Sequence, residues 1–213
     1  MPDTLVWPRI PAAKNLVGDL LIYYSIMRPA FVNHFYRVRV QIVGRLPQPY
    51  DGPLILYMNH SAWWDLYMTA LLNYEVFRRR FDSYGMMEEQ QLRRYRFFTW
   101  MGAFSIHRSD RAEATRSLVY ISRVLQEQPG RALYMFPQGQ IVPNDQRPLK
   151  LYTGVARIAR QIGRWCCVRW RCATSFAATN DRRPLSALAR GTALSQPTPH
   201  PMCRPSPQIS STA

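Results

Sequence analysis

The sequence has little negative charge and almost no lysine. Thirteen of its 213 residues are Asp or Glu against 28 Lys or Arg, which gives a formal net charge of +15 at pH 7. Only Lys14 and Lys150 are lysines, so arginine supplies nearly all of the positive charge. Such a balance suits an anionic membrane surface, a nucleic acid or an acidic substrate equally well. Charge alone therefore does not choose among these partners.

Several signatures that would assign a function directly are also missing. No charged start leads into a short apolar run with a small-residue cleavage site, so we expect no signal peptide. The Gly-x-Ser-x-Gly elbow of many serine hydrolases is absent. The arginines are scattered rather than gathered on a DNA- or RNA-binding motif, so we expect no nucleic-acid partner.

The cysteines do not indicate a metal site. All four lie beyond residue 164: Cys166, Cys167, Cys172 and Cys203. Their spacing is wrong for a zinc ribbon and no His pair completes a ligand set, so we expect no bound metal.

The most apolar early stretch, residues 16–32, is interrupted by Asp19 and Arg28. It falls short of the ~20 apolar residues that a membrane-spanning helix needs. Aromatic and basic residues lie within it or beside it: Trp7, Tyr23, Tyr24, Phe31, Arg37 and Arg39. Residues 1–35 are thus predicted to hold a helix that either lies in a membrane interface or packs against the core.

Strand-like and helix-like patterns alternate up to Gly163, which indicates a single α/β domain over residues 36–164. We expect a central mixed sheet flanked by helices. The predicted strands cover residues 36–43, 54–58, 80–86, 103–107 and 132–136, and the predicted helices cover 62–72, 88–100, 110–128 and 151–162.

A His-x4-Asp box, His60 to Asp65, directly follows the apolar run 54–58. A histidine paired with a carboxylate can take the proton of an alcohol as its oxygen attacks a thioester. Five residues along a helix are ~140° apart, so the two side chains do not share a helix face. We therefore predict His60 in the strand-to-helix turn and Asp65 on the first turns of the helix.

Three further segments follow in a fixed order. They are Gly102-Ala103-Phe104-Ser105-Ile106-His107-Arg108, then Phe136-Pro137-Gln138-Gly139-Gln140-Ile141-Val142, then Lys150 with Gly154. With the His-x4-Asp box and the Asn59 before it, these segments resemble the blocks of the glycerolipid acyltransferase family. That family includes the glycerol-3-phosphate and lysophosphatidic acid acyltransferases.

The resemblance implies an enzyme of phospholipid biosynthesis that moves a fatty acyl group from acyl-CoA or acyl-carrier protein to a lipid hydroxyl. It implies catalysis by His60 and Asp65, and substrate binding by Asn59, Arg108, Gln138, Gly139 and Lys150. It also implies that no metal or redox cofactor takes part, and that the protein is peripheral or monotopic at the cytoplasmic face of the membrane. Tyr84, Met86, Met87 and residues 95–100 are candidates to line an acyl groove, although we expect most of them to pack in the core.

Two residues depart from the third block. Gln138 stands where the family has Glu, and Ile141 stands where it has Arg, a usual cation for the acceptor phosphate. Arg147 or Lys150 is a candidate replacement for that cation. We expect a weaker dependence on an acceptor phosphate, which keeps glycolipid, carotenoid glycoside and larger lysophospholipid acceptors open. The alternative is a non-catalytic basic protein with a decayed site that binds membranes or nucleic acid.

The composition changes at residue 165. The last 49 residues hold one acidic residue, Asp181, with six prolines and all the cysteines. The family's fourth block, a strand resembling Val-x-x-x-Pro-Val-Ala, is missing there. Read from the last base of the Arg164 codon, the permitted triplets allow Val-Val-Leu-Cys-Pro-Val-Ala-Leu-Arg. We therefore interpret residues 165–213 as an irregular tail translated out of frame, which leaves the domain incomplete at its C-terminal end.

Overall fold

A five-stranded sheet lies at the centre of this computed structural model, which describes residues 7–35, 38–42, 44–163 and 166–170. The strands are β1 (Leu54–Met58), β2 (Asp82–Glu88), β3 (Ala103–Ile106), β4 (Arg131–Met135) and β5 (Cys166–Trp170), in the order β3-β2-β4-β1-β5. The α/β class is confirmed. The expectation of a mixed sheet is wrong, because every pairing among the described strands is parallel. Each of the strands β1 to β4 is followed by helical segments that return the chain to the same end of the sheet.

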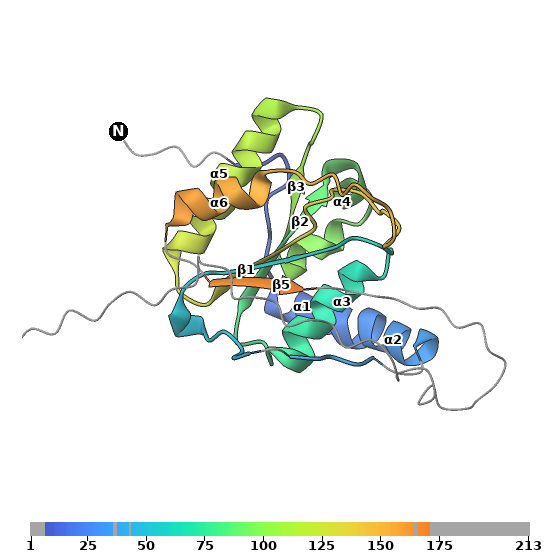
Figure 1. The fold of residues 1–213 in the computed structure, drawn as a ribbon. Coiled ribbons are helices and arrows are strands. Elements are labelled where there is room, and N and C mark those ends of the chain that lie inside the picture. Colours follow the sequence, from blue (N-terminus) through green and yellow to red (C-terminus); the bar gives the residue numbers. More distant parts are fainter. Residues whose placement is uncertain (1–6, 36–37, 43, 164–165, 171–213) are drawn as a thin grey trace, which may run out of the picture. The chain divides into compact units, whose positions relative to one another are not determined.

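Helices cover both faces of the sheet (Figure 1). Helices α5 and α6 lie on one face, and α1, α2 and α3 lie on the other. The α-helices are α1 (Leu16–Ile22), α2 (Arg28–His34), α3 (Asp65–Leu71), α4 (Glu89–Arg94), α5 (Arg111–Glu127) and α6 (Gly154–Ile162). The described residues also form two π-helical turns (Tyr23–Met27 and Leu72–Val76) and two 3₁₀ turns (Pro49–Asp51 and Arg96–Met101).

Strand β1 shows why the sheet is buried on both faces. Its side chains alternate, as the period of a strand requires. Ile55 packs with the α5 and α6 side chains, whereas Leu54 and Leu56 pack with Phe77 and other residues of the opposite layer. All three β1 side chains are fully buried. A strand buried on both faces is typical of a parallel sheet between two helical layers.

The N-terminal helical segment packs with one side only. Ile22, Tyr23 and Met27 are buried in a cluster with α3 side chains. Large apolar residues of the same segment remain exposed: Leu16, Val17, Leu21, Tyr24, Ile26 and Val32. Both readings of this segment therefore have a structural counterpart. No helix among the described residues combines the length and the apolar character that crossing a membrane requires.

Three sequence predictions about elements are corrected. The described part of the predicted strand 36–43, residues 38–42, pairs with no strand, because alternation alone supplies no hydrogen-bonding neighbour. The predicted helix 88–100 breaks at Tyr95, whose ring packs with the aromatic side chains of the 3₁₀ turn that follows. The tail predicted to be irregular from residue 165 includes a strand, because β5 completes the open edge of β1 from Leu54↔Cys166 to Met58↔Trp170. The rest of that prediction, residues 171–213, lies outside the described part of the chain.

Candidate active site

Three of the sequence blocks meet at one edge of the sheet because their strands are parallel. The His-x4-Asp box follows β1, Arg108 follows β3, and the third block, residues 136–142, follows β4. In parallel α/β sheets the loops after the carboxyl ends of the strands form the usual ligand site. Strands β1 and β4 are direct neighbours, so the first and third blocks come into contact.

His60 and Asp65 form a hydrogen-bonded pair at this edge. The imidazole Nδ1 lies 2.9 Å from Asp65 Oδ2. Asp65 is the first residue of α3 and fully buried, while the His60 side chain is 20% exposed. The same carboxylate oxygen accepts hydrogen bonds from the backbone N–H groups of Ser61 and Ala62 at 2.6 and 2.9 Å. Histidine in the turn and aspartate at the helix start is the arrangement that the spacing predicts.

The third block holds His60 from the other side. The His60 backbone N–H donates to Gln138 Oε1 at 2.5 Å, and its carbonyl accepts from the N–H of Val142 at 2.8 Å. The imidazole stacks on the Phe136 ring with centroids 4.3 Å apart. The histidine is therefore fixed at its backbone and on one face of its ring, which leaves Nε2 as the nitrogen not bound to Asp65.

Arg108 joins the ends of three strands. Its Nε donates to Glu88 Oε2 at 2.6 Å, at the end of β2, and its Nη1 donates to the carbonyl oxygen of Gly139, after β4. Arg108 itself follows β3. The guanidinium is therefore engaged by the protein's own groups.

Gly139 has a conformation and a surrounding that both favour glycine. Its φ is +67°, in the left-handed region that other residues rarely adopt. A Cβ at this position would lie 2.8 Å from Arg108 Nη1 and 2.8 Å from the Tyr152 ring. The missing side chain thus makes room for Arg108 and Tyr152.

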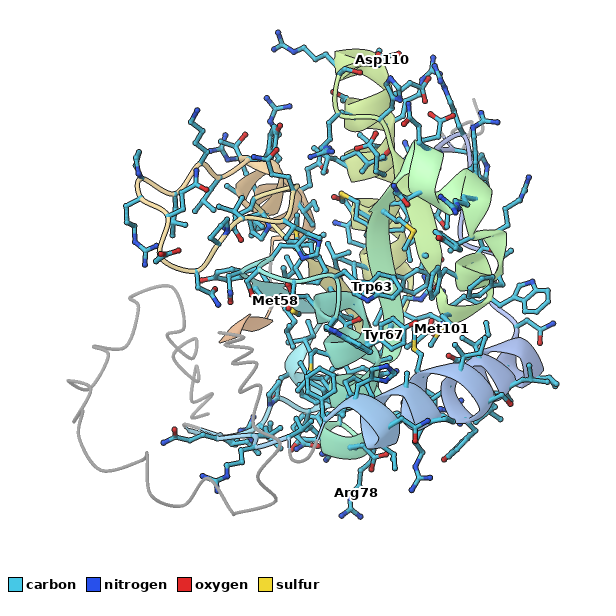
Figure 2. The ribbon with its side chains drawn as sticks, turned by 90° about the vertical axis from the view of Figure 1, so that its right-hand side faces the viewer. Met58, Trp63, Tyr67, Arg78, Met101 and Asp110 are labelled. Carbon is cyan, nitrogen blue, oxygen red and sulfur yellow. The ribbon has the colours of Figure 1, made fainter. Side chains whose placement is uncertain are left out.

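A cavity of about 800 Å³ opens beside the His60 ring. One part of its wall is apolar and is formed by Leu66 of α3, by Met86 and Met87 of β2, and by Tyr95 and Phe98 after α4. Trp63, 52% exposed, also borders the cavity and contacts Tyr67 edge-on with ring centroids 5.2 Å apart (Figure 2). A long ligand with a polar end would meet the apolar wall along its chain and the His60 ring at its polar end.

The acyltransferase family matches residues 37–168, more than half of the chain. The protein belongs to this family, which includes the glycerol-3-phosphate and lysophosphatidic acid acyltransferases. A search of curated proteins found no significant match. Family membership makes the protein an acyltransferase of lipid metabolism, with an acyl donor and a lipid acceptor.

Three of the predicted binding residues of this acyltransferase lie away from the cavity wall. Asn59 donates from Nδ2 to Asn144 Oδ1 at 2.7 Å and so ties the end of β1 to the loop after β4. Lys150 is exposed and does not border the cavity. Gln138 contacts the His60 backbone instead of the cavity. Met86, Met87, Tyr95 and Phe98 of the predicted groove do line it, whereas Tyr84 and Trp100 do not.

Sequence reasoning missed two charged residues of the cavity wall, Glu88 and Arg157. The predicted strand 80–86 stops two residues before Glu88, where β2 ends in the structure. Arg157 lies inside a predicted helix and belongs to no motif. Its place on the first turns of the helix after the third block was the available signal, since that end of the helix faces the carboxyl edge of the sheet.

Proposed function

We propose that the protein transfers a fatty acyl group from acyl-CoA or acyl-carrier protein to the hydroxyl of a lysophospholipid, glycerol phosphate or related glycolipid, with His60 as general base. The observation that carries the proposal is the 2.9 Å contact of His60 Nδ1 with Asp65 beside a cavity large enough for an acyl chain. Asp65 holds the imidazole in the tautomer whose Nε2 accepts a proton.

The proposed reaction has two steps. The acceptor oxygen attacks the thioester carbonyl carbon as its proton moves to His60 Nε2. The carbon–sulfur bond then breaks, and the imidazolium returns the proton to the departing thiolate. Buried Asp65 stabilises the imidazolium between the steps. A positioned general base contributes about 10²–10⁴-fold to such a rate.

The apolar part of the cavity wall supports a fatty acyl chain as the transferred group. Leu66 of α3, Met86 and Met87 of β2, and Phe98 after α4 border the cavity. Burial of a methylene group contributes about 0.8 kcal/mol, so a long chain gains far more there than an acetyl group. Methionine side chains also adapt readily to a flexible ligand.

The exposed apolar face of the N-terminal segment supports work at a membrane surface. Val17, Leu21 and Tyr24 are 72%, 57% and 57% exposed on a segment whose other side is buried. Such a helix inserts its apolar side among lipid headgroups, and arginines nearby favour an anionic leaflet. We propose that the protein works at the cytoplasmic face of the cell membrane, where both lipid substrates partition.

An assay with defined donors and acceptors tests the proposal. Palmitoyl-CoA or palmitoyl-acyl-carrier protein would be combined with lysophosphatidic acid, glycerol-3-phosphate, a larger lysophospholipid or a glycolipid. Thiol release and the acylated lipid would be measured together. We expect at least one acceptor to give a product whose amount equals the thiol released. Membrane binding without acyl transfer to any acceptor would favour a non-catalytic binder instead.

A further inference from the structure

The charges of the cavity wall are not balanced among themselves. Besides His60, the charged side chains that border the cavity in the described part of the chain are Glu88, Arg108 and Arg157. Glu88 and Arg108 pair with each other at 2.6 Å. Arg108 also donates to the Gly139 carbonyl. Arg108, which the family resemblance implies as an anion-binding residue, is therefore already engaged by Glu88 and Gly139.

Arg157 is different. It lies in α6 and is exposed to the solvent of the cavity. Within the residues that the structure describes, its guanidinium has neither a carboxylate partner nor a hydrogen bond to the protein. Its backbone N–H completes the first turn by donating to Thr153 O at 3.1 Å, so the helix fixes where the side chain starts. A guanidinium presents five donors in a planar fork that matches a phosphate.

The two cations considered from the sequence do not occupy this place. Arg147 donates from Nη1 to the carbonyl oxygens of Asn144 and Gln146 at 3.0 and 2.7 Å. Neither Arg147 nor Lys150 borders the cavity, whereas Ile141 does, at the position where the family has arginine. The third block has Ile141 where the family has a cation, and Arg157 on α6 brings a cation to the same cavity.

We infer that Arg157 binds a phosphate ester of one of the two co-substrates and supplies the charge that Ile141 lacks. This inference rests on the proposed acyl transfer. The same chemistry has two sources, the phosphates of coenzyme A and the headgroup phosphate of the acceptor. If the acceptor is the source, the expectation of weak dependence on an acceptor phosphate is overturned as well.

Steady-state kinetics of the full chain separate the two sources. Variants Arg157→Gln and Arg157→Lys would be compared with Arg160→Gln, which removes the same charge from an exposed position of the same helix outside the cavity. Donors would be palmitoyl-CoA and the phosphate-free palmitoyl-N-acetylcysteamine thioester. Acceptors would be lysophosphatidic acid and monoacylglycerol.

We expect Arg157→Gln to raise KM about tenfold for the substrate whose phosphate it binds, because a charge-assisted hydrogen bond is lost. Arg157→Lys should recover part of this loss. A rise confined to palmitoyl-CoA assigns the donor, and a rise confined to lysophosphatidic acid assigns the acceptor. If Arg157→Gln changes no KM more than Arg160→Gln does, the inference is wrong.

A binding measurement keeps this test separate from the proposed activity. Calorimetric titration of the wild type and Arg157→Gln with coenzyme A and with glycerol-3-phosphate needs no turnover. Weaker binding of either probe by Arg157→Gln alone supports the site even if no acyl transfer is found. Unchanged binding of both probes excludes it.

Discussion

The backbone N–H of His60 donates a hydrogen bond to Gln138 Oε1 over 2.5 Å, although the two residues are 78 positions apart in the chain. Gln138 stands where the family resemblance has Glu, and it is buried, with 6% of its surface exposed. An amide oxygen and a carboxylate oxygen both accept a hydrogen bond. The departure from the family pattern therefore preserves the contact that positions the histidine.

Replacing Gln138 tests this positioning role. Gln138→Ala removes the acceptor and leaves the His60 N–H unpaired, which costs about 1–3 kcal/mol of stability and shifts the histidine. Gln138→Glu retains an acceptor and should keep most of the activity. Urea unfolding and kcat with saturating substrates measure the two effects. Equal activity of Gln138→Ala and the wild type would show that the contact is dispensable.

Gly139 and Gly163 allow the cost of backbone strain to be separated from the cost of a steric clash at the Cβ position. Both have a positive φ, +67° and +69°, but a Cβ at Gly163 would meet no atom of the described residues within 4 Å. Gly163→Ala should therefore cost only the backbone strain, about 1–3 kcal/mol. Gly139→Ala should cost more and should also lower activity, because the new methyl group displaces Arg108 or Tyr152. Thermal unfolding and turnover of both variants would be compared, and equal losses would contradict the steric account.

Membrane binding should depend on the exposed side of the N-terminal segment. Leu21→Glu replaces a 57% exposed apolar side chain with a charge. Leu21 would be buried in the lipid on binding, so its replacement is expected to weaken binding to anionic phospholipid vesicles about tenfold or more. Tyr50→Glu, at a 75% exposed aromatic residue on the Pro49–Asp51 turn, serves as the control. Vesicle flotation in which both variants bind like the wild type would remove the support for this face.

The gene's nucleotide sequence tests the interpretation of the tail. Strand β5 pairs with β1. In the alternative frame the same stretch of the gene would encode a more apolar strand that contains Val, Leu and Ala. We expect the frame that starts one base before the Trp165 codon to remain open and to encode residues like those of the family. Stop codons soon after that point would end the interpretation. The protein translated in that frame should unfold at a higher temperature.

The parts of the fold that the sequence predicted correctly are those with strong local signals. Asp110 caps α5 by accepting from the N–H groups of Ala112 and Glu113, at the start of the predicted helix 110–128. Strand β1 was predicted to the residue, because an apolar run is bounded by Pro53 and the polar Asn59. The parallel pairing of β5 depends on the open edge of β1, a tertiary feature that no local pattern carries.

The candidate site follows the same division. The spacing of His60 and Asp65 was enough to predict a turn histidine and a helix-start carboxylate. The Glu88–Arg108 pair was not predictable, since it joins the ends of two strands whose adjacency only the sheet order establishes. For the same reason Arg157 could not be assigned to the cavity before the fold was known.

The most direct test of the account is the turnover of His60→Ala in the assay that measures thiol release and the acylated lipid together. His60 is partly exposed, so the variant should fold like the wild type, which circular dichroism and thermal unfolding would verify. His34→Ala, at an exposed histidine of α2, provides the matched control. We predict that His60→Ala loses about 10²–10⁴-fold in kcat while His34→Ala stays near the wild type. A folded His60→Ala protein that keeps most of its turnover would contradict the role of His60 as the base.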